Sequence, residues 1–263
     1  MTARVRVTDL MARKGGQKIS ILTAYDATMA RLLDQAGVDA LLVGDSLAMV
    51  ILGEETTIPV TMAMMIHHTQ AVAKGARRAL VIADLPFLSY QVNREQAMMN
   101  AGRLVQEGGA AAVKIEGGET VAPAVRCIVE AGIPVMGHIG LTPQSVHRLG
   151  GHRPGVNSDA HTRQLLNDAR ALAEAGAFSI VLECVPAETA RAVTEAVTIP
   201  TIGIGSGPHC DGQVLVSYDA FGLYPSPPPF VKQYAQLGGQ LISAAKAYVD
   251  DVRQGRFPAC PSN

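Results

Sequence analysis

VDALLVGDS, residues 38–46, is a short apolar run that ends in an aspartate and a serine. Two later runs follow the same plan: ALVIADLPF at residues 79–87 contains Asp84, and AAVKIEGG at 111–118 contains Lys114 and Glu116. Strands that are buried on both faces read as continuous Val, Ile and Leu, as in a parallel sheet. These runs therefore predict parallel strands with ionisable side chains at their carboxyl ends.

The same pattern extends along the chain and alternates with helix-like sequence. His138 lies in PVMGHIG, Glu183 lies in FSIVLECV, and Asp26 ends ILTAYD. We expect strands at residues 18–26, 38–45, 79–84, 111–116, 134–139, 178–183, 200–204 and, after a short helix, 218–222. We expect helices at residues 27–36, 61–75, 93–108, 120–131, 159–175, 187–197 and 230–253, and long loops at 46–60 and 140–157.

Eight strands alternating with helices predict an α/β fold, a (β/α)8 TIM barrel, which uses roughly 250 residues. The chain has 263 residues and no linker-like segment, so we expect one domain over residues 1–263. The first seventeen residues precede the first strand and are expected to cap the bottom of the barrel. A doubly wound open sheet is the alternative, but it predicts a glycine-rich turn after the first strand, where TAYDAT has no glycine.

The charge and the apolar content of the chain argue against nucleic acid and membranes as partners. The net charge is -1, without a basic stripe, so nucleic acid is not an expected partner. No apolar stretch reaches the roughly 18 residues of a membrane span, and the N-terminal residues lack the apolar core of a signal peptide. We expect a cytoplasmic protein that contacts no membrane. Charged residues make up 17%, below the usual 25% or so, which fits a buried sheet and a large subunit interface.

The four cysteines are scattered and predict neither a disulfide framework nor a zinc site. No pair forms CxxC, and no histidine stands at zinc-ligand spacing from a cysteine. In the reducing compartment expected for this chain, disulfides are rare. We expect Cys127 and Cys184 to be packed thiols, and we assign no role to Cys210 and Cys260.

Three acids at consecutive strand ends predict a metal site. Neighbouring strands lie under about 5 Å apart, so carboxylates at their ends can share one cation. Ligands that are all oxygen suit Mg²⁺ better than Zn²⁺, which prefers His and Cys. We therefore expect Mg²⁺ on Asp45, Asp84 and Glu116. The alternative is that each acid only caps the turn or helix that follows it.

Three further residues are candidates for substrate contact and proton transfer. Lys114 and Glu116 are two residues apart on one strand, so their side chains point to the same side, where the ammonium group of Lys114 needs an anion. The alternative is that Lys114 and Glu116 form an ion pair with no role in binding. Glu183 lies across the barrel from the metal acids, where a carboxylate can act as a general base. His138 could donate a hydrogen bond to a developing oxyanion, or it could be a packed core histidine. Asp26 could cap a helix as readily as catalyse.

Eight stretches occur in an order that resembles a known enzyme family: LTAYDA, GDSLAMVILG, TTIPVTMAMMIHHT, ADLPFLSY, VKIEGG, GHIGLTPQSV, LECVP and GIGSGPHCDGQVLV. As a set they resemble the ketopantoate hydroxymethyltransferases over residues 3–257. The resemblance implies hydroxymethyl transfer from 5,10-methylenetetrahydrofolate to 3-methyl-2-oxobutanoate, giving 2-dehydropantoate in pantothenate and coenzyme A biosynthesis. It also implies Mg²⁺, a magnesium-stabilised enolate, and a homo-oligomer, typically a decamer of two pentameric rings.

Matched position by position, the resemblance places roles on residues already selected. It implies metal ligands at Asp45, Asp84 and Glu116, substrate contacts at Asp45, Ser46, Asp84 and Lys114, and the proton acceptor at Glu183. Ser206 stands at the usual alanine of GIGAG, so the folate contacts stay open.

Two other functions remain as alternatives. A magnesium-dependent lyase or mutase of the isocitrate-lyase/phosphoenolpyruvate-mutase type also holds oxo acids, but its Lys-Lys-Cys-Gly-His signature is absent here. A barrel that only binds a ligand or scaffolds an oligomer need not gather a lysine, a base and metal acids at one mouth.

Overall fold

The structure, a computed structural model, describes residues 3–151 and 158–259, and it contains a closed parallel barrel. Each strand pairs in parallel with the next along the chain, and the last strand pairs with the first. The predicted (β/α)8 fold is confirmed. The strands are β1 Ile19–Thr23, β2 Ala40–Val43, β3 Leu80–Asp84, β4 Ala112–Glu116, β5 Val135–Gly140, β6 Ser179–Glu183, β7 Thr201–Ile204 and β8 Gly212–Leu215.

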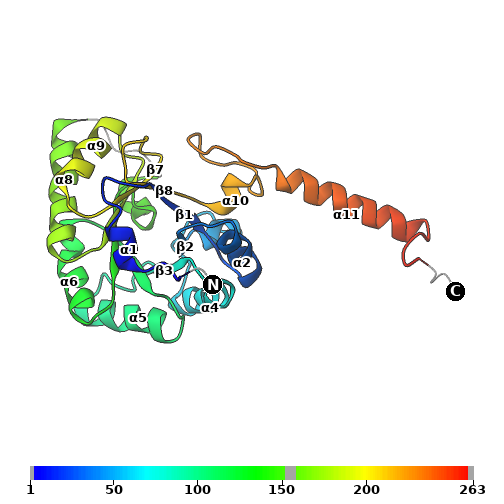
Figure 1. The fold of residues 1–263 in the computed structure, drawn as a ribbon, viewed down its shortest axis with the longest axis horizontal. Helices are drawn as coiled ribbons and strands as arrows, with labels where there is room; N and C mark the ends of the chain where they lie inside the picture. The colour runs from blue at the N-terminus through cyan, green and yellow to red at the C-terminus, as the bar shows by residue number, and fades with distance from the viewer. Residues whose placement is uncertain (1–2, 152–157, 260–263) are drawn as a thin grey trace. The chain divides into compact units, whose positions relative to one another are not determined.

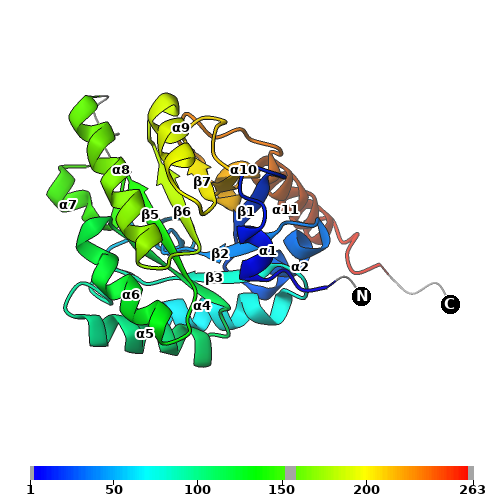
Figure 2. The ribbon, with the colours of Figure 1, turned by 60° about the vertical axis from the view of Figure 1, so that its left-hand side comes forward.

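Helices follow most of the strands and lie outside them, as Figures 1 and 2 show for α5, α6, α8 and α9. The long helices of the barrel match the predicted ranges closely. The helices are α1 Val7–Met11, α2 Ala27–Gln35, α3 Leu47–Val50, α4 Met62–Gly75, α5 Arg94–Gln106, α6 Ala122–Glu130, α7 Val146–Leu149, α8 Asp159–Glu174, α9 Ala187–Ala196, α10 Ser217–Ala220 and α11 Leu237–Arg253, with short 3₁₀ turns η1 Glu119–Val121 and η2 Pro143–Ser145.

The predicted helix starts have the expected caps. The hydroxyl of Thr61 accepts the Met64 N–H at the start of α4, and the side chain of Asn93 accepts the Gln96 N–H at the start of α5. Asp26 caps α2 by accepting the N–H groups of Thr28 and Met29, which confirms its structural role. These side chains satisfy N–H groups that have no partner within their helices.

The predicted eighth strand was wrong in place and order. The chain forms β8 at Gly212–Leu215 first and α10 at Ser217–Ala220 after it. In β8, Val214 is buried whereas Gln213 is exposed, which is the period-two alternation of a half-covered strand. Gly212 is required because a Cβ there would lie 2.5 Å from the Ile19 carbonyl oxygen of β1.

Two long loops contain more structure than was predicted. The loop at 46–60 contains α3, and the loop at 140–157 contains η2 and α7. Residues 152–157 of the second loop lie outside the described residues, as does Cys260. Cys127, Cys184 and Cys210 are free thiols, of which Cys127 and Cys184 are half-buried.

The N-terminal residues close the bottom of the barrel, as predicted. Val5 and Leu10 are buried in one cluster with inward side chains such as Ile19, Leu80 and Phe178, near the starts of their strands. The Val5 N–H donates to the Arg78 carbonyl oxygen at 2.8 Å.

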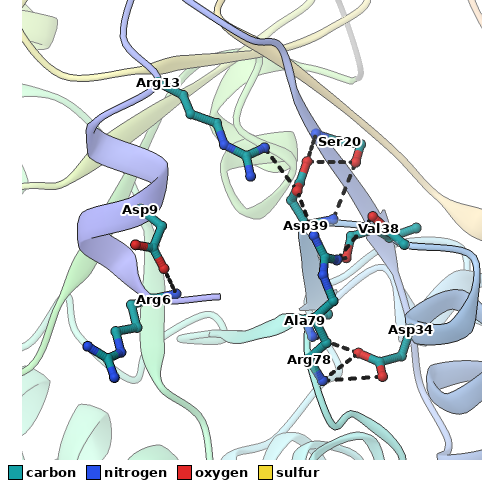
Figure 3. A network of polar contacts seen from close by, with 10 residues as sticks. Arg6, Asp9, Arg13, Ser20, Asp34, Val38, Asp39, Arg78 and Ala79 are labelled. Carbon is teal, nitrogen blue, oxygen red and sulfur yellow. Dashed lines mark hydrogen bonds and ion pairs between the residues drawn. The ribbon is translucent and has the colours of Figure 1, made fainter. Parts of the chain in front are cut away.

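Asp39, just before β2, holds the segment that follows α1 through an ion pair with Arg13. Figure 3 shows that Asp39 meets both the backbone and the side chain of Ser20, the guanidinium of Arg13 and that of Arg78. The Arg13–Asp39 pair is 2.9 Å long. This network ties the N-terminal segment to the first three strands on the side opposite the strand C-termini.

The contacts divide the chain into two compact units, residues 1–215 and 216–263. The first contains the whole barrel, and the second contains α10 and α11. The prediction of one domain over 1–263 stays a prediction. Among the described residues, no helix is both long enough and apolar enough to cross a membrane.

Candidate active site

The strand register brings the predicted polar residues together at the carboxyl ends of the strands. Asp84 lies opposite Lys114 in the β3–β4 pair, and Glu116 lies opposite His138 in the β4–β5 pair. Asp45 follows β2, and its backbone N–H donates to Asp84 Oδ2 at 3.1 Å. Residues far apart in the chain thus form one cluster, as parallel-barrel geometry requires.

A lysine and a histidine connect the acids of this cluster. Lys114 Nζ lies 3.1 Å from Asp84 Oδ1 and 3.4 Å from His138 Nδ1. His138 Nδ1 lies 3.4 Å from Glu116 Oε1, and its Nε2 lies 3.1 Å from Glu183 Oε2. His138 therefore stands between a predicted metal ligand and the predicted base.

Burial separates Glu183 from the other acids. Asp45, Asp84, Glu116, Lys114 and His138 are all buried, whereas the side chain of Glu183 keeps 17% of its surface exposed. A partly exposed carboxylate next to a buried polar cluster can reach a bound substrate and still exchange a proton with solvent. This position fits the predicted base.

The pKa values reflect the crowding of like charges. Burial and the charges of Asp84 and Glu116 raise the pKa of Asp45 well above its ordinary value. Burial also raises the pKa of Asp84, although the Lys114 ammonium opposes the rise. Burial alone would raise the pKa of Glu116, but its contact with His138 and the charge of Lys114 lower that pKa. Asp45 is therefore the hardest of the three acids to ionise.

The two basic groups of the cluster are stabilised in their charged forms. Burial would lower the pKa of Lys114, but Asp84, Glu116 and Asp45 raise it above its ordinary value. Burial and Lys114 would lower the pKa of His138, but its contacts with Glu116 and Glu183 raise that pKa to about 9. Near neutral pH the mouth therefore holds two cations that can face an anionic substrate.

Ser46 stands beside this cluster. It is half-buried at the start of α3, and its hydroxyl lies 2.9 Å from the Tyr25 hydroxyl. A Cβ at Gly44 would lie 2.7 Å from Ser46 Oγ, so the turn between β2 and α3 leaves little room there. The substrate role of Ser46 stays a prediction.

Two residues of the site were missed in the sequence. The Tyr90 O–H shares its one hydrogen between Gln144 Oε1 at 2.8 Å and the Glu116 carbonyl oxygen at 3.0 Å. Gln144 donates from its side chain to Asp45 Oδ2 at 2.8 Å and from its backbone N–H to Glu116 Oε2 at 3.1 Å. Both residues lie in stretches quoted above for the family resemblance, ADLPFLSY and GHIGLTPQSV, but outside the apolar runs, so the strand-end pattern did not select them.

The chemistry of the donors fits a divalent cation. The described residues contain no group of three His, Cys, Asp or Glu side chains already arranged as a metal cluster. Even so, three buried carboxyl groups face one ammonium and one imidazole, and ionising Asp45 adds negative charge that needs a counterion. Their oxygen atoms suit Mg²⁺. Asp45, Asp84 and Glu116 stay the predicted ligands.

Fold and site together define a class. A closed (β/α)8 barrel that gathers acids, a lysine and a histidine at its carboxyl-terminal mouth is a barrel enzyme for a small anionic substrate. The chain belongs to the ketopantoate hydroxymethyltransferase family, whose sequence model matches residues 4–260. The predicted enzyme class, a hydroxymethyl-transferring enzyme, is thereby confirmed.

Two close relatives, which share one enzyme name, match this chain over nearly its whole length. A 3-methyl-2-oxobutanoate hydroxymethyltransferase of Moorella thermoacetica is 57% identical over 258 residues, covering 97% of this chain and 96% of the relative. The protein of that name from Syntrophus aciditrophicus is 55% identical over 247 residues, covering 94% of this chain and 91% of the relative.

Solved structures that share the fold are more distant. A phosphonopyruvate hydrolase in complex with oxalate and Mg²⁺ has a TM-score of 0.64 at 13% identity, covering 97% of this chain and 91% of that one. A 2,3-dimethylmalate lyase has a TM-score of 0.62 at 19% identity, covering 100% and 92%. These likenesses show the fold, which the lyase and mutase alternative also has, whereas the sequence relatives are hydroxymethyltransferases.

Proposed function

We propose that this barrel transfers a hydroxymethyl group from 5,10-methylenetetrahydrofolate to 3-methyl-2-oxobutanoate. With one water consumed, the products are 2-dehydropantoate and tetrahydrofolate, a step of pantothenate and coenzyme A biosynthesis. The observation that carries the proposal is the placement of Glu183, partly exposed and 3.1 Å from His138, across from the buried acid and lysine cluster. Family membership supplies the substrate.

In the proposed deprotonation step, Lys114 and His138 bind the substrate and Glu183 accepts the proton. Lys114 and His138, both charged near neutral pH, bind the carboxylate and keto oxygens of the 2-oxo acid, with Ser46 beside them. Glu183 accepts the proton from C3, and the electron pair of the C–H bond moves to the enolate, where Lys114 and His138 balance the charge. The water that is consumed replaces the two C–N bonds of the folate methylene carbon with a C=O bond, and tetrahydrofolate leaves. C3 then forms its new bond to that carbon, whose oxygen takes up the proton held by Glu183 and becomes the hydroxyl of the product.

A divalent cation, Mg²⁺, is part of the proposal. Asp45, Asp84 and Glu116 would hold it, and it would supply Lewis-acid polarisation of the 2-oxo acid. We also propose that the protein acts in the cytoplasm as a homo-oligomer of the decameric type that the family resemblance implies.

The proton-transfer step can be tested without folate. Incubating the protein with 3-methyl-2-oxobutanoate and Mg²⁺ in D₂O should exchange the C3 proton, followed by NMR. Glu183→Gln cannot accept that proton, and we expect exchange to slow by about 10²–10⁴-fold. Glu188→Gln, a matched change at an exposed site of α9, should exchange normally. Exchange at the wild-type rate in Glu183→Gln would refute the base assignment.

The reaction and the metal site are tested by product analysis. Adding the folate should yield 2-dehydropantoate, whereas a lyase or mutase would break or rearrange the oxo acid. Asp84→Ala should lose activity, because the change removes a proposed metal ligand and the partner of Lys114. Full activity of Asp84→Ala with unchanged Mg²⁺ dependence would place the metal elsewhere.

A further inference from the structure

Gln144 is hydrogen-bonded at every polar position of its buried side chain. Its Nε2 donates to Asp45 Oδ2 at 2.8 Å and to the Leu85 carbonyl oxygen at 2.9 Å. Its Oε1 accepts from Tyr90 O–H at 2.8 Å and from Gln91 Nε2 at 3.3 Å. Only 4% of Gln144 is exposed. A primary amide has two N–H donors and an acceptor oxygen with two lone pairs, so this one is fully satisfied.

The surrounding donors and acceptors allow one direction for the amide. Rotating the group by 180° would set its oxygen against Asp45 and the Leu85 carbonyl, which are acceptors, and its NH₂ against the Tyr90 hydroxyl and the Gln91 amide. The Tyr90 hydroxyl has one hydrogen, which Gln144 Oε1 and the Glu116 carbonyl oxygen, 3.0 Å away, share, so the Asp45 and Leu85 acceptors decide the direction of the amide. The NH₂ therefore has a fixed direction toward Asp45.

The backbone of the same residue contacts a second acid. The Gln144 N–H donates to Glu116 Oε2 at 3.1 Å, so one residue holds an oxygen of Asp45 and an oxygen of Glu116. Those acids come from the ends of different strands, β2 and β4. A donor that fixes one oxygen of a carboxylate also fixes the direction in which the other oxygen points.

We infer that Gln144, oriented by Tyr90, is a positioning residue that aligns Asp45 and Glu116 for a divalent cation. The inference rests on the proposed function, which makes those two acids metal ligands. Gln144 itself need touch neither the metal nor the substrate. Its effect on metal affinity comes from directing two carboxylates that would otherwise repel one another.

The test is Mn²⁺ binding, measured by the EPR signal of free Mn²⁺ on purified protein without substrate. Gln144→Met keeps the length of the side chain and removes the four hydrogen bonds of its amide, including the one to Asp45, while the backbone N–H to Glu116 remains. We expect its Mn²⁺ affinity to fall about 10- to 100-fold, as is typical when an outer partner of a metal ligand is lost. Gln70→Met, which removes a hydrogen bond from a side-chain amide on α4 to the Glu107 carbonyl oxygen after α5, should bind as wild type does.

Tyr90→Phe supplies an independent variant in case Gln144→Met does not fold. It leaves the amide in place and removes the donor that orients it, so we expect affinity to fall about 2- to 10-fold, the effect of one hydrogen bond. Because Tyr90 acts through Gln144, the double variant should bind Mn²⁺ no more weakly than Gln144→Met alone.

The outcomes separate this inference from the proposed function. If the wild type binds Mn²⁺ and Asp84→Asn binds it equally well, the proposed metal site is wrong. If Asp84→Asn loses Mn²⁺ while folded Gln144→Met and Tyr90→Phe bind it like the wild type, the metal site stands and the positioning role is overturned. A purely structural glutamine would lower the unfolding temperature without changing the affinity of the folded protein.

Discussion

At the scale of the residue, Asp211 shows how one carboxylate holds the chain at the barrel bottom. Its Oδ1 accepts the Gly15 N–H at 2.9 Å, and its Oδ2 accepts the Thr201 N–H at 2.8 Å and pairs with Lys14 at 2.9 Å. Asp211 thereby joins the segment before β1 to the first residue of β7. The side chain is buried, so its partners have no easy replacement in water.

Asp211→Asn should lower the free energy of unfolding by about 1–3 kcal/mol. The amide removes the charge that pairs with Lys14, and its NH₂ group meets N–H donors that need an acceptor. Urea unfolding at pH 7 measures the change. Asp250→Asn, at an exposed position of α11, is the matched control and should stay near wild type. A wild-type midpoint for Asp211→Asn would contradict the role assigned to this carboxylate.

The stabilising effect of Asp211 should depend on pH. Burial would raise the pKa of Asp211, but the N–H groups of Thr201 and Gly15 and the charge of Lys14 lower it below 3.8. A lowered folded pKa means that the stabilisation is complete above the unfolded value and is lost as the pH falls through the folded one. The stability difference between wild type and Asp211→Asn should therefore shrink in acid below about pH 4. A difference that stays constant from pH 7 to pH 3 would contradict this linkage.

At the scale of the element, the loop after β5 connects both sides of the site. The Leu141 N–H donates to the Glu183 carbonyl oxygen at 2.8 Å, and three residues later Gln144 contacts Asp45 and Glu116. Gly140, the last residue of β5, leads into this loop with φ +95°, a backbone conformation that residues with a side chain disfavour. A Cβ at Gly140 would lie 2.4 Å from the Glu183 carbonyl oxygen.

Gly140→Ala should therefore lower kcat and stability together. The positive φ alone costs roughly 1–2 kcal/mol for alanine, and the Cβ displaces the backbone of Glu183. We expect slower C3 proton exchange in D₂O and a lower unfolding midpoint. Gly102→Ala in the middle of α5, where a Cβ would meet nothing within 4 Å, should be neutral or stabilising by about 0.5–1 kcal/mol. Normal exchange in Gly140→Ala would show that the loop tolerates the shift.

The elements also show what the sequence could predict and what it could not. Continuous apolar runs located the first seven strands, and the ionisable residue near the end of each run identified Asp84, Lys114, Glu116 and His138 before their contacts were known. The eighth strand was misplaced because Gly212 and Gln213 interrupt its apolar pattern. Gln144 was missed because its burial depends on Tyr90, a partner 54 positions away along the chain, and no local pattern encodes such a contact.

At the scale of the whole molecule, the second unit carries an apolar surface that stands out. No residue of α11 is buried, and Leu241 and Ile242 are 65% and 58% exposed. Tyr248, Val249 and Val252 follow at spacings that place them on the same face of the helix. Polar residues, among them Ser243 and Asp250, lie on the opposite face. A stripe of this kind indicates a surface that is covered by protein.

We predict that this chain forms the proposed homo-oligomer and that a second copy covers this stripe in it. Leu241→Asp combined with Val249→Asp should lower the solution mass measured by light scattering, because the two charges would have to be buried without partners. Asp250→Lys, a charge change on the opposite face, should leave the mass of the wild type unchanged. A wild-type protein that is monomeric would refute both the oligomer and the role of α11. An oligomer that survives the two aspartates would show that other surfaces of the chain hold it together, and that the stripe of α11 contacts something else.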